Sequence, residues 1–433
     1  MTPARARLAR GVYSVLMGLL QPAYALRLWW RGRAEPGYRE AIGERFGRYP
    51  RSRGAGFVWV HAVSLGETRA AAALVDALRA RRPGLALLLT HGTATGREAG
   101  RALLRPGDVQ AWLPFDTPGA VRRFLAHFRP AVGVLMETEV WPNLMHAAAE
   151  AGVPMVLANA RLSERSRRRG ERYVALLHPA VAGLALALAQ TEADAQRLRS
   201  AGAAEVRVAG NLKFDLAPDA ALVERGRAWR HALSRPVLLA AVTREGEEAM
   251  LLEAWAAWPA ATTPRPLLVI VPRHPQRFDE VAALVQARGL TLARRSGWRE
   301  APPPDALQAD AWLGDSMREM ALYYGTADVA LLGGSFAPLG GQNLIEAAAC
   351  ACPVVMGPHT FNFADAAERA EAAGAAERVA DLPAALRAAA ALLADPVRRD
   401  QASARGLAFA AAHRGAALRM AEAIDGLIGS KPS

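Results

Sequence analysis

Short apolar runs alternate with alanine-rich segments along most of the chain, and this alternation constrains the fold more than any other feature. Each run is too short for a helix and is apolar on both sides, which is typical of an inner strand of a parallel sheet. We expect strands at residues 57–62, 85–90, 109–113, 131–136, 155–158, 184–189 and 206–209, then at 236–242, 267–272, 311–313, 329–332 and 353–356. Strands that alternate with helices predict an α/β protein with parallel sheets covered by helices on both faces.

The chain is too long, at 433 residues, for one ordinary core, and a second series of strands begins near residue 236. We therefore expect an N-terminal segment at 1–33, a first domain at 34–210, a linker at 211–232, a second domain at 233–405 and a helical C-terminal segment at 406–433. Ligands of such sheets bind outside the carboxyl ends of the strands. Two sheets that face each other would therefore place the site in the cleft between the domains.

The stretch 328–346, DVALLGGSFAPLGGQNLIE, joins a strand to a helix that we expect over 342–350. The free N–H groups and the partial positive charge of a helix start favour a phosphate there, and the glycines of the turn 333–335 let the backbone approach it closely. Ser335 would donate its hydroxyl, and Glu346 would accept hydrogen bonds from sugar hydroxyls. The alternative is an ordinary strand-to-helix turn, since neither the dinucleotide fingerprint nor the P-loop pattern occurs in this stretch.

Carboxylates follow two strands of the first series. Glu67 lies at a glycine turn that enters a helix, where it would either take a proton from a bound hydroxyl or only stabilise the helix dipole. Glu137 and Glu139 follow the strand at 131–136, and an extended backbone would point both side chains the same way. They would bind sugar hydroxyls or tune the pKa of a neighbour, unless one of them caps the next helix.

Positive charge dominates the composition, with a formal net charge of +12 that is nearly all arginine. Such a balance favours acidic partners such as phosphates or anionic lipids. Arg273 is a natural phosphate ligand because its fork matches phosphate oxygens, and His274 would be a second donor. The arginine run at 161–172 would hold an acceptor phosphate, rest on anionic lipid or be a solvated face. No aromatic platform accompanies it, so we expect no nucleic-acid partner.

Residues 1–33 differ from the rest of the chain. Gly11–Leu26 is a run of 16 residues without a charge, flanked by arginines and followed by Trp29 and Trp30. A spanning helix needs about 20 apolar residues, and a Gln-Pro pair interrupts this run. Basic flanks and paired tryptophans predict an anchor at the membrane interface, the alternative being a helix that docks on the protein.

Cys350 and Cys352 are the only cysteines, and they lie two apart in an apolar run. This placement indicates core packing in a reducing compartment. No group of His, Cys, Asp and Glu residues has convincing metal-ligand spacing, and no G-x-S-x-G nucleophile elbow occurs. We therefore expect no metal and no cofactor.

Eleven motifs follow one another in the sequence: WVHAVSLGE (59–67), LTHGTATG (89–96), LPFDTP (113–118), METEVWPN (136–143), NARLSERS (159–166), QTEADAQRL (190–198), GNLKFD (210–215), TREGEE (243–248), PRHPQRF (272–278), GDSMREM (314–320) and GGSFAPLGGQNLIEAAA (333–349). Together they resemble the bacterial 3-deoxy-D-manno-octulosonic acid (Kdo) transferases. These membrane-associated lipopolysaccharide enzymes transfer Kdo from CMP-Kdo to a lipid A precursor. The resemblance covers nearly the whole chain after residue 35; any single motif is weak, whereas eleven in order are specific.

The resemblance implies a GT-B glycosyltransferase fold, in which two Rossmann-like domains face a central cleft and the C-terminal helix crosses back to the first domain. It implies that Glu67 is the catalytic base that activates the acceptor hydroxyl, and that Glu137 lies on the Kdo or acceptor side. It implies a second domain that binds CMP-Kdo through Pro272 and Arg273 at the nucleotide, Met317 near the cytosine, Gly334 and Ser335 at the phosphate, Asn343 near the sugar nucleotide and Glu346 at the ribose.

The resemblance also implies the cytoplasmic face of the cell inner membrane as the location, and CMP-Kdo, the lipid A precursor (lipid IVA) and the membrane surface as partners. Three positions depart from the family pattern: Gln342 and Arg244 replace histidines, and Arg318 stands where glycine is common. Two other functions stay open at this point. One is another GT-B enzyme with a UDP-linked sugar, either a transferase or an epimerase, and the other is a non-enzymatic basic protein that binds membrane or nucleic acid.

Overall fold

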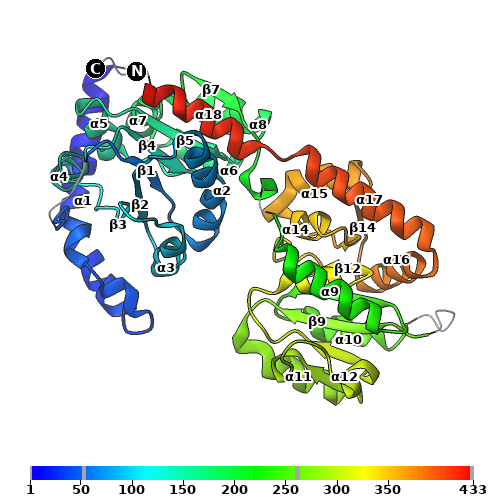
Figure 1. The fold of residues 1–433 in the computed structure, drawn as a ribbon. Coiled ribbons are helices and arrows are strands. Elements are labelled where there is room, and N and C mark those ends of the chain that lie inside the picture. Colours follow the sequence, from blue (N-terminus) through cyan, green and yellow to red (C-terminus); the bar gives the residue numbers. More distant parts are fainter. Residues whose placement is uncertain (1, 51–54, 216, 259–263, 430–433) are drawn as a thin grey trace. The chain divides into compact units, whose positions relative to one another are not determined.

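The chain forms two compact units in the computed structural model, which describes residues 2–50, 55–215, 217–258 and 264–429 (Figure 1). The first unit comprises Met1–Asp215 together with Arg414–Ser433, and the second comprises Leu216–His413. Most of the stretch expected as a linker, 211–232, is regular structure. Residues 212–215 form a short 3-10 helix, and Ala220–Ala232 form α9, which packs on α13 (Met320–Thr326) of the second unit.

The first unit contains a sheet of seven parallel strands. In spatial order these are β3 (Val109–Trp112), β2 (Leu87–His91), β1 (Val58–His61), β4 (Val132–Met136), β5 (Met155–Ala160), β6 (Leu186–Ala189) and β7 (Val206–Val208). The direction in which consecutive strands are added reverses between β1 and β4, which are hydrogen-bonded neighbours. The carboxyl ends at such a switch point are where doubly wound sheets bind ligands.

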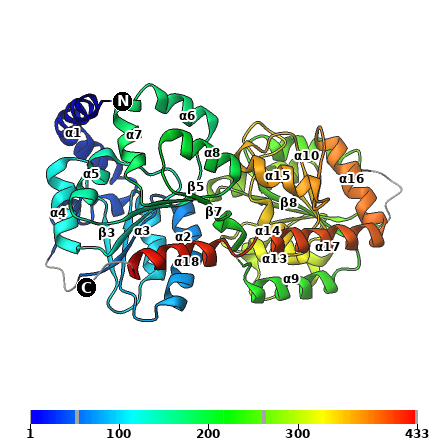
Figure 2. The same ribbon diagram turned by 90° about the horizontal axis from the view of Figure 1, so that it is seen from above.

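Helices cover both faces of this sheet. They are α2 (Leu65–Arg81), α3 (Ala94–Gly100), α4 (Pro118–Phe128), α5 (Pro142–Glu150), α6 (Glu164–Glu171), α7 (Val174–Ala182), α8 (Glu192–Ala201) and α18 (Ala416–Gly429). One core packs Trp59 and Leu88 against Phe124 of α4, and the core on the other face packs Val60 and Leu74 against Met420 of α18. The C-terminal helix α18 therefore lies beside α2 and belongs to the core of the first unit (Figures 1 and 2).

Helix α1 (Pro3–Arg31) is a single helix that contacts α5 and α7 (Figure 2). Two side-chain contacts hold it: Ser14 Oγ donates to Asn143 Oδ1 at 2.8 Å, and Gln21 Nε2 donates to Thr117 Oγ1 at 3.0 Å. Its exposed large apolar side chains are Leu8, Val12, Val15, Leu16, Leu19, Leu20, Tyr24, Leu26, Trp29 and Trp30. In the described part of the chain, we find no helix that combines the length and the apolar character needed to cross a bilayer.

The second unit contains another sheet of seven parallel strands. In spatial order these are β10 (Leu292–Arg294), β11 (Ala311–Leu313), β9 (Leu267–Pro272), β8 (Val237–Thr243), β12 (Val329–Leu332), β13 (Val354–Met356) and β14 (Ala376–Arg378). Its other helices are α10 (Glu247–Trp255), α11 (Phe278–Ala287), α12 (Pro304–Gln308), α14 (Leu344–Ala349), α15 (Ala364–Ala372), α16 (Leu382–Ala394) and α17 (Pro396–Ala412). The switch point of this sheet lies between β8 and β12.

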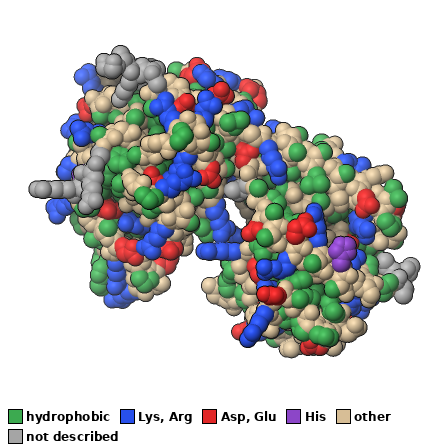
Figure 3. Space-filling model, in the orientation of Figure 1, with side chains coloured by type: hydrophobic (Ala, Val, Ile, Leu, Met, Phe, Trp, Pro, Cys, Tyr) green, Lys and Arg blue, Asp and Glu red, His purple; other side chains and the backbone are tan. Residues whose placement is uncertain are grey.

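The strand pattern of the sequence places most strands within two residues of their observed bounds, but three expectations need correction. The edge strands β10 and β14 were not expected. Each has only three residues, and most of their side chains are partly exposed. The helix expected over 342–350 covers only Leu344–Ala349, because Asn343 is its N-cap. In the visible faces of both units, basic side chains are interspersed with acidic ones and form no single field (Figure 3).

Candidate active site

Glu67 lies just after β1, in the first turn of α2, and its carboxylate is fixed from two sides. Oε2 accepts from the Val63 backbone N–H at 2.9 Å, and Oε1 accepts from Ser64 Oγ at 2.9 Å. Ser64 is also the N-cap of α2, so the two residues cap the helix reciprocally. Thr93, from the loop after β2, donates its N–H (2.9 Å) and its Oγ1 (3.0 Å) to the Val63 carbonyl and so braces this turn.

The carboxylate of Glu67 is half-buried, and burial raises its pKa. The two donors from Val63 and Ser64 act in the opposite direction, and the charge of Glu137 adds to the rise. The capping role and an acid–base role are thus compatible, because the carboxylate is held in place and its pKa is raised toward neutral pH.

Glu137 and Glu139 follow β4, the strand next to β1, and the backbone there is not extended. Glu137 has a left-handed conformation (φ 59°), so the expectation of an extended backbone is wrong. Its N–H donates to the Ala158 carbonyl at 2.9 Å, which ties the turn to the end of β5. The three carboxylates nevertheless form one electrostatic group. Burial raises the pKa of Glu139 to about 7, and the negative charge of Glu67 adds to that rise, with a smaller effect from Glu137.

Lys213 completes this group, and sequence reasoning did not single it out. Burial lowers the pKa of its ammonium group, while the charges of Glu137 and Glu67 raise it and that of Arg161 lowers it. Asn159, at the end of β5, positions the segment, because its Oδ1 accepts from the Leu212 N–H at 3.1 Å. The signal available in the sequence was that only two lysines occur, one of them between two apolar residues of the GNLKFD motif.

The histidines at the strand ends of this unit are structural. His61 is buried, and burial lowers its pKa to about 3; His91 is also buried, and burial lowers its pKa to about 4. His61 Nδ1 contacts Thr90 Oγ1 at 2.9 Å, and His91 Nδ1 contacts the Ala62 carbonyl at 3.0 Å. Both rings are therefore neutral at physiological pH and join β1 to β2.

The position of Glu139 predicts a pH-dependent stability. A carboxyl whose pKa is higher in the folded than in the unfolded state loses stability as pH rises, here between about 4.5 and 7, because the folded state binds the extra proton. We expect Glu139→Gln to stabilise the protein at pH 8 by on the order of 1–3 kcal/mol and to change little at pH 4.5. Thermal melts at both pH values measure this, with Glu192→Gln, an exposed residue on α8, as the control. Equal melting temperatures of Glu139→Gln and wild type at pH 8 would contradict the environment described.

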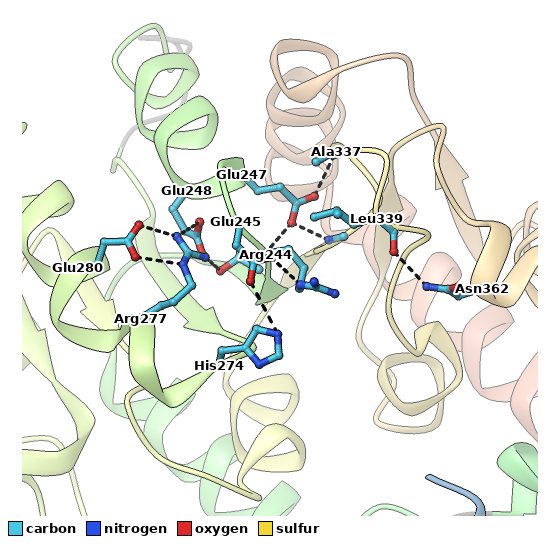
Figure 4. Close-up of polar contacts among 12 residues, drawn as sticks. Arg244, Glu245, Glu247, Glu248, His274, Arg277, Glu280, Ala337, Leu339 and Asn362 are labelled. Atoms are coloured by element: carbon cyan, nitrogen blue, oxygen red, sulfur yellow. Dashed lines mark hydrogen bonds and ion pairs between the residues drawn. The ribbon is translucent and has the colours of Figure 1, made fainter. Parts of the chain in front are cut away.

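In the second unit, the loop after β12 is organised by a carboxylate that we did not expect there (Figure 4). Glu247, in the first turn of α10, is 2% exposed. Its Oε2 accepts from the N–H groups of Arg244 (2.9 Å) and Gly334 (2.6 Å), and its Oε1 accepts from those of Phe336 (3.0 Å) and Ala337 (3.2 Å). One side chain therefore joins the carboxyl ends of β8 and β12.

Glu247 binds the backbone of the turn that belongs to the expected phosphate cradle. The N–H groups of Gly334, Phe336 and Ala337 donate to Glu247, and α14 is a helix of only six residues. The Ser335 side chain is fully buried, and its hydroxyl donates to the Leu332 carbonyl and accepts from the Gly357 N–H at 2.8 Å. The hydroxyl thus joins the ends of β12 and β13.

Glycine is required at positions 333 and 334 of this turn for two different reasons. A Cβ on Gly333 would lie 2.4 Å from the Val242 carbonyl oxygen, so any larger residue would push β8 away. Gly334 has a left-handed backbone (φ 70°). Its carbonyl accepts from the Gly341 N–H at 2.7 Å, which closes the loop between β12 and α14.

Residues after β9 lie at the same edge of the sheet, next to the end of β8, which Glu247 follows. Pro272 is buried at the end of β9, while Arg273 is exposed and its N–H donates to the Thr243 carbonyl at 2.9 Å. Arg277 is braced by a fully buried carboxylate, with its guanidinium 2.8 and 3.0 Å from the two oxygens of Glu248 (Figure 4). A buried, bidentate pair of this kind fixes the loops after β8 and β9 relative to each other.

His274 and the unusual Arg244 share one exposed partner. Arg244 Nε lies 2.9 Å from Glu245 Oε2, and His274 Nε2 lies 3.8 Å from Glu245 Oε1 (Figure 4). The arginine that replaces a histidine of the family pattern is thus neutralised locally by its neighbour. At position 318 the backbone is left-handed (φ 68°), which explains why glycine is common there in the family pattern.

The remaining predicted site residues lie around the same edge. Met317 follows β11 and is 57% exposed. Asn343 caps α14, with its Oδ1 3.2 Å from the Ile345 N–H. Glu346, in the first turn of α14, lies near Cys350, whose pKa burial raises to about 12 with a further rise from the Glu346 charge. In the described residues, we find no group of three or more His, Cys, Asp or Glu side chains arranged to hold a metal.

Comparisons with known proteins show the family to which this chain belongs. Residues 40–216 match the family model described as 3-deoxy-D-manno-octulosonic-acid transferase (kdotransferase). The 3-deoxy-D-manno-octulosonic acid transferase of Bordetella pertussis is 51% identical, over 98% of this chain and 100% of the relative. The enzyme of the same name from Haemophilus influenzae is 35% identical, over 82% of this chain and 83% of the relative.

A solved structure of UDP-GlcNAc 2-epimerase from Neisseria meningitidis is similar in fold, with a TM-score of 0.56 and 15% identity over 87% of this chain and 100% of that one. At this identity the likeness concerns the fold alone. The two parallel sheets with their helices, and this likeness, agree with the expected GT-B fold. The chain therefore belongs to the family of 3-deoxy-D-manno-octulosonic acid (Kdo) transferases, which are glycosyltransferases.

Proposed function

We propose that this enzyme transfers Kdo from CMP-Kdo to a hydroxyl of the lipid A precursor, with inversion at the anomeric carbon. Glu67 takes the proton of the acceptor hydroxyl, and the oxygen forms a new bond to the anomeric carbon of Kdo. The bond between that carbon and the phosphate oxygen breaks, and CMP leaves with the electron pair. The proposal needs no metal, because cationic side chains, Arg273 first among them, would stabilise the leaving phosphate.

The observation that carries this proposal is the placement of Glu67 at the switch point of the first sheet, held by the Val63 N–H and Ser64 Oγ at 2.9 Å each. A half-buried carboxylate with a raised pKa is a better base near neutral pH than an exposed one. Lys213 would balance the negative charge of the group while Glu67 is ionised. Glu137, held in a left-handed turn, would bind hydroxyls of Kdo or of the acceptor.

We place CMP-Kdo in the second unit, at the carboxyl ends of β8, β9 and β12. Arg273 is exposed at this edge and would bind the phosphate. Glu247 would act indirectly, by fixing the loop 334–337 around which the sugar nucleotide lies. The other donor contacts in the proposal are Pro272 and Met317 near the nucleotide base, Gly334 at the loop, Asn343 at the sugar nucleotide and Glu346 at the ribose.

The outer face of α1 supports a membrane-bound acceptor. Its exposed apolar side chains, with Trp29 and Trp30 beside arginines at its end, are typical of a helix that lies in the membrane interface. We propose that α1 holds the first unit at the cytoplasmic face of the inner membrane, where the lipid acceptor of lipopolysaccharide synthesis is made accessible.

Incubation with CMP-Kdo and a tetra-acylated glucosamine disaccharide bisphosphate tests this proposal, with the products measured by mass spectrometry. We expect a mass increase of one or more Kdo residues on the disaccharide and the release of CMP. CMP, but not UDP, should raise the melting temperature of the protein. Transfer from a UDP-linked sugar, or protection by UDP alone, would overturn the assignment of the donor.

A further inference from the structure

A pocket of about 540 Å³ lies in the first unit, between α1 and the carboxyl ends of β1 to β4. This volume lies within the range of small-molecule sites. Its lining is largely apolar and is contributed by α1 and by the loop after β3: Met17, Leu20, Leu28, Leu113 and Phe115. Such a pocket can bind an apolar chain, because moving apolar surface out of water is favourable.

Arg45 lines this pocket and is a buried cation without an acidic partner. It is 5% exposed, and among the described residues no carboxylate lies within ion-pair distance of its guanidinium. Its contacts are the Gly92 carbonyl, at 2.9 Å from Nη2, and the Trp112 ring, whose centroid is 4.0 Å away. Burial lowers its pKa to about 10, so it stays charged at physiological pH. Buried charges are normally paired, which suggests that an anionic or strongly polar ligand group completes this one.

Tyr38 adds a second unsatisfied group to the same lining. The residue is 3% exposed, and in the described part of the chain its hydroxyl has no hydrogen-bond partner. Its ring stacks on Trp112, with centroids 6.3 Å apart, so it shares a neighbour with Arg45. Buried hydroxyls are usually hydrogen-bonded, so this one also indicates an oxygen-bearing ligand.

The pocket adjoins the proposed base. Val63, whose N–H holds the Glu67 carboxylate at 2.9 Å, lines it, and so does Glu139. At the other side, the pocket is lined by the exposed residues Leu20 and Arg27 of α1. A ligand in this pocket can therefore extend from the surface of α1 to the neighbourhood of Glu67.

We infer that this pocket binds an acyl chain of the anionic glycolipid acceptor, with oxygens of its ester or phosphate groups bound by Arg45 and Tyr38. The inference rests on the proposed function and deepens it, since it names the part of the acceptor that the first unit recognises. The apolar wall binds the chain. The ligand oxygens pair with the buried arginine and tyrosine, which an aliphatic chain alone would leave unsatisfied. Binding of the chain positions the disaccharide so that one hydroxyl reaches Glu67.

Two variants test the inference in kinetic measurements on the tetra-acylated disaccharide bisphosphate in detergent micelles and on the same disaccharide stripped of its acyl chains. Met17→Trp fills part of the apolar wall, and we expect it to raise KM for the acylated acceptor about tenfold, as displacing about two methylene groups would. KM for the stripped acceptor and for CMP-Kdo should stay within about twofold. Leu407→Trp, at an exposed site on α17, is the matched control and should leave every constant unchanged.

Tyr38→Phe removes only the unpartnered hydroxyl. We expect it to raise KM for the acylated acceptor about three- to tenfold, and to leave the melting temperature of the free protein equal or higher. A purely structural role for this hydroxyl would instead lower the melting temperature and leave KM unchanged.

The inference is overturned if Met17→Trp behaves like Leu407→Trp, or if it raises KM for both acceptors equally. Should Met17→Trp melt at a much lower temperature than wild type, Leu20→Trp on the same wall makes the same test. Failure of the proposed function would look different, because the wild-type protein would then transfer Kdo to neither acceptor.

Discussion

Replacing Glu67 by alanine should lower kcat for Kdo transfer by about a thousandfold, while CMP still raises the melting temperature as in wild type. Removal of a general base typically reduces the rate by factors of 10² to 10⁴. The donor contacts proposed here lie in the second unit, whereas Glu67 contacts Val63 and Ser64 of the first. The loss should therefore appear in kcat rather than in the KM for CMP-Kdo.

The capping contacts of Glu67 make a stability control necessary. Loss of a helix cap costs about 1 kcal/mol, which lowers the melting temperature by only a few degrees. Glu192→Ala removes an exposed carboxylate from the first turn of α8 in the same unit and should keep normal turnover. If Glu67→Ala transferred Kdo at a near-normal rate, Glu67 would have no role as the base and would be only a cap.

Replacing Glu247 by alanine should raise KM for CMP-Kdo by about a hundredfold and lower the melting temperature of the protein. The change leaves four backbone N–H groups without their acceptor, and each buried unsatisfied donor costs about 1–3 kcal/mol unless the loop rearranges. Rearrangement relieves that cost, but it moves the loop 334–337 away from its position beside the proposed donor site. Displacement of this loop weakens donor binding. A hundredfold rise in KM corresponds to about 2.7 kcal/mol of binding free energy.

Two further variants separate a positioning role from general destabilisation. Glu247→Gln keeps one carbonyl acceptor and should recover part of the affinity for CMP-Kdo. Glu253→Ala, at an exposed position on α10, should leave both KM and the melting temperature unchanged. The positioning role would be contradicted if Glu247→Ala lowered the melting temperature but left KM for CMP-Kdo at the wild-type value.

The fold was accessible from the sequence because buried parallel strands are uniformly apolar. Runs such as those that form β4 and β9 have no polar residue, and their observed bounds differ little from the expected ones. The edge strands β10 and β14 escaped prediction because Leu292–Arg294 and Ala376–Arg378 mix apolar and charged residues over only three positions. Their strand character comes from pairing with β11 and β13, which local sequence does not encode.

The candidate site was accessible only in part, for a similar reason. Polar residues directly after strands, such as Glu67 and Arg273, could be found because strand ends converge at one edge of a sheet. Glu247 could not, since its partners Gly334, Phe336 and Ala337 lie 87 to 90 positions further along the chain. The glycine turn 333–335 predicts a close approach of the backbone to a phosphate, whereas tertiary structure brings the buried Glu247 carboxylate to the N–H groups of this turn.

The most direct test of the central claim is the anomeric configuration of the transferred Kdo, measured by NMR on the product formed from CMP-Kdo. A single displacement, in which Glu67 deprotonates the acceptor and its oxygen attacks opposite to CMP, predicts a linkage of the configuration opposite to that in CMP-Kdo. A product with the configuration retained would require a second displacement and would contradict the role assigned to Glu67.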